Sequence, residues 1–268
     1  NRTTLMLRAS IMTTTIYDRV NRLVATDSRW SRGLDNLGYP GHVAYVDDTG
    51  FGKMAVRDDH VLTLAGNGLL IQHWKEWWAT DLSEPRPPIL IDGSEAITLH
   101  IVKISTNTII FDIGEMLAAQ YIDENGQIIT NAVFAGTGAP YAGGTWQKTG
   151  CARTSIDAAK ANDIRTGGEV RYVDFNSGSM NIETSKLLIS DVAEALLHKG
   201  MIMDTNNLLS QPVPITENEV SHIRQLIANG DITPCAPTGG KTVNWTAKSL
   251  SRLDAAIDSI RRDEAEQA

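Results

Sequence analysis

The first part of the chain alternates short runs of β-branched residues with polar turns. Residues 13–18 and residues 23–29 are two such runs, rich in Thr, Ile and Val, and only four residues separate them. This spacing predicts a tight hairpin in which Asp27 returns beside Thr13. An edge hairpin with solvated threonines would show the same local pattern, so the hairpin alone does not establish a site.

The same pattern predicts further strands along the chain. Single strands are expected at residues 42–46, 53–57, 61–65 and 169–175. A second sheet is expected from four runs, at residues 96–104, 108–113, 119–122 and 128–134. Asn125 and Gly126 form a turn dipeptide typical of hairpins between the last two runs.

Apolar residues recur at helical spacing in five other segments. These predict helices at residues 69–79, 155–163, 185–198, 216–228 and 246–264. The first carries three tryptophans at a spacing typical of core packing, and prolines follow it. The last carries an apolar stripe of Leu250, Leu253, Ile257 and Ile260, which must be buried on its own core or on a neighbouring subunit.

Composition excludes several classes of protein. A chain of 268 residues is long enough for one large domain, with or without an appendage. The net charge of −8 argues against nucleic acid and acidic membranes as partners. No apolar run approaches the roughly 18 residues of a membrane span. Cys151 and Cys235 form neither a disulfide framework nor a metal motif, so we expect reduced thiols in a cytoplasmic protein.

Motifs for other chemistries are incomplete. Residues 239–242 read Gly-Gly-Lys-Thr, like the end of a phosphate-binding loop, but Cys235 stands where that motif needs glycine. The six histidines are scattered without metal-ligand spacing, and no nucleophile elbow is present. We therefore expect neither a metal nor a cofactor.

Five groups of small and polar residues stand in one order along the chain. They are Thr13-Thr14-Thr15-Ile16, Ala25-Thr26-Asp27-Ser28-Arg29, Lys53 with Ala65-Gly66-Asn67, Gly136-Thr137-Gly138, and Asp163 to Gly168. In this order the sequence resembles the proteasome β-subunit family of N-terminal nucleophile hydrolases, which includes the HslV peptidase and stand-alone bacterial homologues such as Anbu and BPH. The resemblance covers about residues 13–200.

The resemblance implies a fold and a division of the chain. The family has an α+β fold, a four-layer α/β/β/α sandwich with two antiparallel sheets, and the predicted order of strands and helices is compatible with it. Residues 1–12 would be a propeptide or an added extension, and residues 13–200 the hydrolase domain. Residues 201–268 would form a helical C-terminal extension, either an appendage or an oligomer contact.

The resemblance also implies a set of catalytic residues. Thr13 would become the N-terminal nucleophile, with its α-amine, of pKa about 8, as general base. Lys53 would favour the alkoxide of Thr13, and Asp27 would hold Lys53, although this pair could instead be a buried structural ion pair. The Gly66 N–H would stabilise the oxyanion. The α-amine and the local water would be held by Thr137, Asp163 and Thr166.

The family lines its main side-chain pocket at positions that correspond to Trp30, Phe51, Ala55, Leu64 and Gly68. Large apolar residues predominate there, which predicts cleavage after apolar residues unless the aromatic rings themselves fill the pocket.

The leading prediction is a self-processing threonine endopeptidase that acts on polypeptides inside a homo-oligomeric ring. Six or seven subunits would form each ring, in one ring or two stacked rings, with an unfoldase or ATPase as a possible partner. Two alternatives remain open. One is a catalytically silent or unprocessed ring subunit that keeps residues 1–12, and the other is an amidase acting on a small molecule.

The chain also departs from the family pattern. Thr137 and Thr166 replace serines but keep a hydroxyl, and Asn67 replaces a glycine. The segment between Asp27 and Lys53 is longer than in common β-subunits. These differences bear on subfamily and substrate preference more than on the chemistry.

Overall fold

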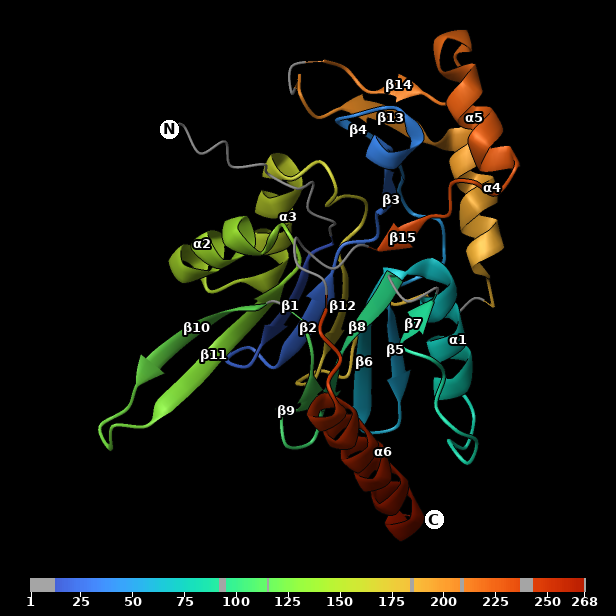
Figure 1. Cartoon of the computed structure of the whole chain (residues 1–268). Helices are drawn as coiled ribbons and strands as arrows, with labels where there is room; N and C mark the ends of the chain where they lie inside the picture. Colours follow the sequence, from blue (N-terminus) through green and yellow to red (C-terminus); the bar gives the residue numbers. More distant parts are fainter. Residues whose placement is uncertain are drawn as a thin grey trace, which may run out of the picture.

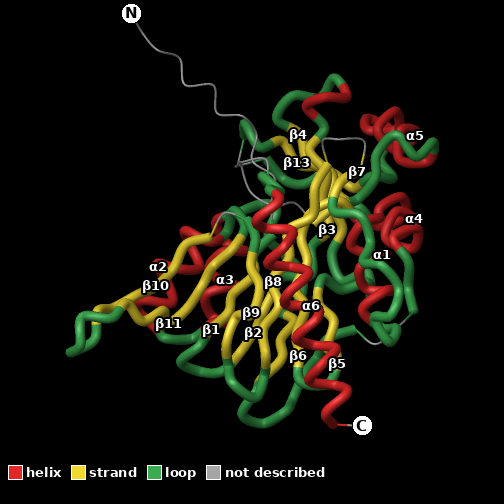
Figure 2. The backbone as a smooth tube through the Cα atoms, turned by 60° about the horizontal axis from the view of Figure 1, so that its bottom comes forward, coloured by secondary structure: helices red, strands yellow, loops and turns green. Residues whose placement is uncertain are grey.

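The computed structural model describes residues 13–91, 95–114, 116–183, 186–207, 210–236 and 243–267. The expected extension, residues 1–12, lies outside the described residues. The chain combines helices with two antiparallel sheets, so the predicted α+β class is confirmed (Figures 1 and 2).

The smaller sheet contains the predicted hairpin. Its strand order is β10 (Met116–Ile122), β11 (Ile128–Ala135), β1 (Thr15–Asp18), β2 (Leu23–Thr26) and β12 (Arg171–Asp174). Thr15 pairs with Thr26 in the β1–β2 hairpin, as predicted. The hairpin is not at an edge, because β11 pairs with β1 on one side and β12 pairs with β2 on the other.

The larger sheet has the order β14, β13, β4, β3, β15, β6, β8, β7, with β5 also paired to β6 and β9 to β8. Its strands are β3 (Trp30–Gly33), β4 (His42–Val46), β5 (Met54–Arg57), β6 (His60–Asn67), β7 (Leu90–Ile91), β8 (Glu95–Lys103), β9 (Thr108–Asp112), β13 (Met201–Asp204), β14 (Val213–Pro214) and β15 (Cys235–Ala236).

One prediction about the sheets is wrong. The four runs expected to form a single second sheet are divided, with β8 and β9 in the larger sheet and β10 and β11 in the smaller one. Phe134 of β11 pairs with Ile16 of β1, whereas Ile97 of β8 pairs with Gly66 of β6. The alternation of residues predicted each strand, but it carries no information about which distant strand is the partner.

The helices of the described residues are α1 (Gly68–Trp78), α2 (Ala139–Thr149), α3 (Ala152–Asn162), α4 (Ile189–Lys199), α5 (Ser221–Ala228) and α6 (Ala247–Gln267), with short 3₁₀ turns at Asp35–Leu37 and Asn218–Val220. Five of these were predicted, and α2 was missed. Gly143 and Gly144 lie inside α2 and lower its helix propensity. Gly143 faces the ring of Phe134, so this helix is stabilised by close packing on the sheet.

Three apolar clusters hold the elements together. One joins α2 and α3 to the smaller sheet, with Ile16, Phe134 and Ile156 among its members. A second lies between the two sheets and includes Val24 and Val61. The third and largest covers the other face of the larger sheet, with buried side chains of Leu62, Trp74, Leu196, Ile223 and Ile257 from β6, α1, α4, α5 and α6. Figure 1 shows α2 and α3 on the side of the smaller sheet and α1 and α4 on the side of the larger sheet.

The chain after residue 200 is built into the larger sheet and its core. β13 pairs with β4, and β15 lies between β3 and β6. Leu253, Ile257 and Ile260 of α6 are almost completely buried, and Leu250 is half-buried. The apolar stripe of α6 is therefore covered by its own subunit, which was one of the two expected outcomes. The division of the chain at residue 200 into a domain and an extension stays a prediction.

A helix that crosses a membrane must be both long and apolar. Every helix in the described segments is too short or too polar for such a crossing.

Candidate active site

Thr13, Asp27 and Lys53 meet at the start of the smaller sheet. Thr13 lies two residues before β1 and Asp27 directly follows β2, so the hairpin sets them opposite each other. The Thr13 hydroxyl donates a hydrogen bond to Asp27 Oδ1. Lys53 Nζ donates to Thr13 Oγ1 over 2.6 Å and to Asp27 Oδ1 over 2.9 Å. All three residues are at most 2% exposed. The structure thus brings together the three residues that the sequence analysis placed at the reaction centre.

Backbone amides fix the carboxylate of Asp27. Thr14 N–H donates to Oδ1 over 3.0 Å, while the N–H groups of Arg29 and Gly167 donate to Oδ2 over 3.2 and 3.1 Å. Hydrogen bonds to an ionised acceptor are stronger than neutral ones, and they fix its orientation. Thr14, Arg29 and Gly167 all lie within the sequence motifs, but the motifs predicted no contact between these residues and Asp27.

The ammonium of Lys53 is held in a buried environment. Burial lowers the pKa of Lys53, and the nearby charge of Asp27 opposes that shift. A buried ion pair by itself says little about function, because desolvation offsets much of its attraction. Here the same ammonium also donates to a threonine hydroxyl, which in turn donates to the carboxylate. An ammonium that donates to a hydroxyl is an arrangement that can polarise the oxygen toward its alkoxide form.

A second lysine supports the segment that carries Lys53. Lys75 of α1 donates to the carbonyl oxygen of Gly52 over 2.8 Å, and its ammonium lies 4.4 Å from the centre of the Phe51 ring. Burial lowers the pKa of Lys75 to about 8, although the charge of Glu183 opposes the shift. Sequence analysis missed this residue, because it occupies an ordinary position on an amphipathic helix.

Thr137, Asp163 and Thr166 form a second cluster beside the first. Asp163 Oδ2 accepts hydrogen bonds from the hydroxyls of Thr137 over 2.8 Å and Thr166 over 2.6 Å. The hydroxyls of Thr166 and Thr14 lie 2.7 Å apart. The three predicted residues therefore gather as a group and reach the segment that carries Thr13 through Thr14. Their contact with a free α-amine stays a prediction.

Gly136 allows this cluster to approach Thr13. Its φ of +90° is disfavoured for residues with a side chain, and a Cβ atom there would lie 1.5 Å from the carbonyl oxygen of Thr13. Only glycine leaves room for the two segments to approach this closely.

Gly66 lies in β6 with a φ of +124°, paired with Ile97 of β8 and Ala236 of β15. A Cβ atom there would lie 2.3 Å from the Ala96 carbonyl oxygen, so the position requires glycine. Its neighbour Ala65 borders the same pocket as Thr13. The role of its N–H as an oxyanion donor stays a prediction.

The residues expected to line an apolar substrate pocket are largely buried. The rings of Trp30 and Phe51 stack 5.4 Å apart, and Trp30 Nε1 donates to the Phe51 carbonyl oxygen over 2.8 Å. Leu64 is buried, Ala55 is half-buried, and a Cβ at Gly68 would meet Ile189 and the Pro234 carbonyl. The two aromatic rings fill space in the core, which was the second possibility named for them. Their use in substrate recognition stays a prediction.

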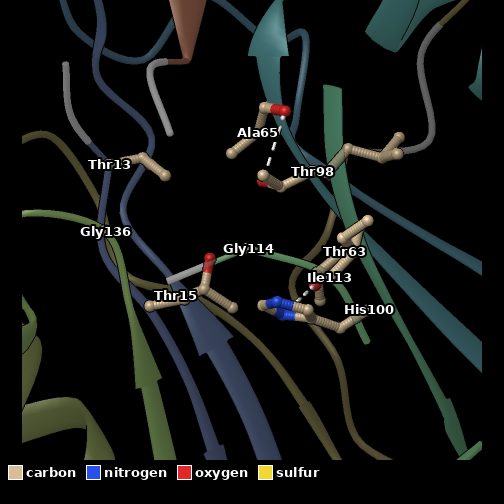
Figure 3. A pocket seen from close by; sticks show the side chains of 11 residues that line it. Thr13, Thr15, Thr63, Ala65, Thr98, His100, Ile113, Gly114 and Gly136 are labelled. Carbon is tan, nitrogen blue, oxygen red and sulfur yellow. Dashed lines mark hydrogen bonds between the residues drawn. The ribbon is translucent and has the colours of Figure 1, made fainter. Parts of the chain in front are cut away.

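A different pocket opens beside Thr13, between the two sheets (Figure 3). It is lined by Thr13, Thr15, Thr63, Leu64, Ala65, Thr98, His100, Ile113, Gly114, Ala135 and Gly136. Sequence analysis identified Thr13 and Leu64 as site residues but missed Thr63, Thr98 and His100. Thr63 with Ala65 and Thr98 with His100 are each two residues apart in a strand, so each pair lies on one face, but nothing in the sequence indicated that these two faces meet.

The described residues offer no evident metal site. No group of three His, Cys, Asp or Glu side chains within them could hold an ion.

Comparison with known proteins gives only distant likeness. No model of a known protein family matches the sequence, and no curated protein matches it. Among solved structures, BPH of Thiobacillus denitrificans in complex with epoxomicin is 14% identical, with a TM-score of 0.32, over 60% of this chain and all of that one. The Gly-1 mutant of Anbu from Hyphomicrobium sp. strain MC1 is 12% identical over 81% of this chain and 94% of that one, with a TM-score of 0.37.

Anbu of Yersinia bercovieri is also 12% identical, with a TM-score of 0.35, over 81% of this chain and 93% of that one. Scores this low do not establish a shared fold or activity.

Proposed function

We propose that this chain is a threonine hydrolase that cleaves peptide bonds with Thr13 as its N-terminal nucleophile. The observation that carries the proposal is the buried contact of Lys53 Nζ with Thr13 Oγ1 at 2.6 Å, with Asp27 bonded to both. A threonine hydroxyl is a weak nucleophile, and an adjacent cation and an oriented carboxylate are the groups that activate it.

The reaction requires a free α-amine on Thr13. In the sequence Met12 precedes Thr13, so the Met12–Thr13 bond must be cleaved first. The freed amine then takes the hydroxyl proton while Oγ1 attacks the carbonyl carbon of the substrate. The C–N bond breaks, and the leaving amine receives that proton. Water hydrolyses the resulting ester and restores the hydroxyl. Until residues 1–12 are removed the chain is a silent precursor.

Other residues take supporting roles in this proposal. The Gly66 N–H stabilises the oxyanion, since donors aimed at developing charge usually provide the largest single stabilisation. Thr137, Asp163 and Thr166 hold the α-amine and the attacking water, through the cluster that reaches Thr14. Lys53 stays protonated during attack, because the carboxylate of Asp27 is in contact with its ammonium group. Backbone N–H groups hold that carboxylate in place.

The proposal extends to fold and assembly. The three apolar clusters support an order of helices, sheet, sheet and helices, as in the four-layer sandwich of N-terminal nucleophile hydrolases. A peptidase in the cytoplasm must restrict the access of other proteins to its active site, and a closed ring provides this restriction. The proposal therefore includes a homo-oligomeric ring of six or seven subunits, single or stacked, with an unfoldase or ATPase as possible partner. Because the stripe of α6 is buried in its own subunit, other surfaces must form the ring contacts.

N-terminal sequencing of active protein tests the proposal directly. We expect mature chains to begin at Thr13, and we expect Thr13→Ala to remain unprocessed and to hydrolyse no peptide. Thr154→Ala, at an exposed position of α3, is the matched control and is expected to leave processing intact. An active preparation that begins at Thr14 or Thr15, or activity in Thr13→Ala, would contradict the proposal.

A further inference from the structure

A short strand from late in the chain lies between two strands that come from its first part. β15 is antiparallel to β3 on one side and to β6 on the other. Cys235 pairs with Ser31 of β3 and with Asn67 of β6, and Ala236 pairs with Gly66. In the strand order of the larger sheet, β15 joins β3 to β6 (Figure 1). Any other strand that lies in this gap must therefore replace it.

The gap that β15 fills lies beside the proposed reaction centre. β3 begins three residues after Asp27, and β6 carries Gly66, the proposed oxyanion donor. Ala65, the neighbour of Gly66, borders the same small pocket as Thr13. A polypeptide whose scissile carbonyl reaches both Thr13 and the Gly66 N–H therefore runs next to β6, in the place of Ala236.

An extended polypeptide binds well where it can add a strand to a sheet, because its backbone N–H and C=O groups then pair with those of the neighbouring strand. At the reaction centre the neighbouring strands are β3 and β6, and β15 pairs with the edges that face each other. One edge group cannot pair fully with β15 and with a substrate at the same time. β15 and a substrate strand therefore compete for one place.

β15 fills the gap without satisfying every buried polar group beside it. The Cys235 thiol donates to the Ser31 carbonyl oxygen over 3.0 Å, and a thiol is a weak donor. The Ser31 hydroxyl is buried and has no hydrogen-bond partner among the described residues. A buried hydroxyl without a partner is unfavourable. A substrate strand that supplies this partner gains a contact that β15 lacks.

The segment before β15 is anchored close to the gap. Ile232 is 1% exposed and belongs to the largest apolar cluster. A Cβ atom at Gly68 would lie 2.5 Å from the Pro234 carbonyl oxygen, so the glycine lets this segment run close to the start of α1. A strand that is tethered beside its site competes at a high effective concentration.

We propose that β15 is an autoinhibitory strand, which occupies the place of an extended polypeptide substrate between β3 and β6 and must leave before a substrate can pair there. The inference rests on the proposed peptidase function and names a regulation of its site. The substrate polypeptide itself displaces β15, and it runs antiparallel to both neighbouring strands, as β15 does.

The first test uses Cys235 to report the position of β15. In a Cys151→Ser background Cys235 is the single cysteine of the chain, and it is 6% exposed. Intact mass measures how fast a maleimide labels it in processed full-length protein, with and without an excess of cysteine-free peptides. We expect peptides to speed labelling by about three- to tenfold, because they bind only the state in which β15 has left the gap.

Ala44→Cys, combined with Cys151→Ser and Cys235→Ser, is the matched control for labelling. Ala44 is 0% exposed on β4 of the same sheet, so labelling at this position reports opening of the whole sheet. We expect no response to peptides there. An unchanged labelling rate for Cys235, or an equal rise at both positions, overturns the inference.

The second test locks β15 in the gap. Ser31 and Cys235 are direct partners on antiparallel strands, a separation that a disulfide spans, so oxidised glutathione should join Cys235 to the new thiol of Ser31→Cys. In the Cys151→Ser background, after processing, we expect this oxidation to lower peptide hydrolysis by about tenfold or more. Dithiothreitol should restore hydrolysis, and the comparison of two states of one protein removes the effect of the substitution itself.

Gln120→Cys with Thr130→Cys is the matched lock, because these two side chains are in contact across β10 and β11, toward the tip of that hairpin. Hydrolysis should be equal in its oxidised and reduced states. Equal hydrolysis by oxidised and reduced Ser31→Cys overturns the inference. Intact mass shows whether each disulfide forms, and the labelling of Cys235 decides if the bond at position 31 does not.

The two readouts separate this inference from the peptidase proposal. Hydrolysis that the lock leaves unchanged, with labelling that peptides leave unchanged, removes the autoinhibitory strand and leaves the peptidase. Labelling that peptides accelerate, without hydrolysis in any state, leaves β15 as a strand that peptides displace and removes the peptidase. Absence of both responses removes both.

Discussion

The ammonium of Lys75 lies 4.4 Å from the centre of the Phe51 ring, while the same group donates to the carbonyl oxygen of the next residue, Gly52. Lys53 follows directly in the chain. A helix residue on the outer side of the larger sheet thereby fixes the segment from which Lys53 reaches Thr13. The position of Lys53 thus depends on a second lysine, Lys75, which lies on a helix and supports the segment through Gly52.

Lys75→Met tests this support. It keeps most of the apolar stem and removes the ammonium, so we expect the turnover number to fall about three- to tenfold as residues 51–53 lose one hydrogen bond. Lys148→Met, at an exposed position of α2, should have no effect. Steady-state kinetics on one peptide provides the measurement, and an unchanged turnover number would show that the Lys53 segment holds itself in place.

The same variant gives a pH dependence of stability. The pKa of Lys75 is lowered to about 8 in the folded chain, so between pH 8 and the unfolded value the folded state binds fewer protons than the unfolded state. The free energy of unfolding of the wild type should therefore rise through this window, relative to Lys75→Met, by up to about 3 kcal/mol. Below pH 8 the difference should be constant. Urea denaturation at several pH values measures it, and a flat difference up to pH 10 would contradict the lowered pKa.

Lys53→Ala should lower turnover by about 10³-fold or more while leaving the secondary structure intact, because it removes the charge that favours the Thr13 alkoxide. Lys53→Arg should rescue little, since a planar guanidinium differs in shape from an ammonium and keeps its proton. Single-turnover kinetics with circular dichroism distinguishes the possibilities. Loss of the fold with either substitution would favour a structural ion pair, and near-normal activity of Lys53→Ala would contradict the mechanism.

Gly136→Ala should damage the site through sterics alone. Gly136 and Gly38 both have φ of +90°, but a Cβ at Gly136 would lie 1.5 Å from the Thr13 carbonyl oxygen, whereas nothing lies within 4 Å of a Cβ at Gly38. Gly38→Ala therefore reports backbone strain, about 1 kcal/mol, without the clash. We expect Gly136→Ala to abolish processing and Gly38→Ala to process normally, as seen by intact mass. Normal processing of both would show that the segments can separate without cost.

Ile257→Ala tests whether α6 belongs to the core of its own subunit. Ile257 is 3% exposed, so truncation should cost about 2–5 kcal/mol of unfolding free energy through lost burial and the cavity left behind. Ser251→Ala, on the exposed face of α6, should change it by less than about 0.5 kcal/mol. Denaturation curves at two protein concentrations provide the measurement. A loss for Ile257→Ala that disappears on dilution would instead place this residue at a subunit contact.

Local sequence patterns determined the hairpin at the centre of the site. Four residues between two β-favouring runs leave few ways to connect them, so the return of Asp27 to Thr13 follows from the order of residues alone. The helices with a continuous apolar stripe, such as α1 and α6, followed from the same kind of short-range periodicity. Lys53 was identified from its place in the motif order of the family that the sequence resembles, rather than from the residues next to it in the sequence. Its contact with Thr13 spans forty positions of the chain, and the structure shows that contact.

Only the tertiary structure decided which distant strands pair and which side chains therefore meet. β11 paired with β1 and β10 with β11, rather than either with β8, and β15 entered the larger sheet from a segment in which no strand was predicted. Thr63 meets His100 because β6 pairs with β8, and Gly136 meets Thr13 because β11 pairs with β1. Lys75 meets Gly52 because α1 packs beside the segment before β5. Each pair is separated by more than twenty residues, and a period of two or of 3.6 residues specifies one face of one element, not the surface that will cover it.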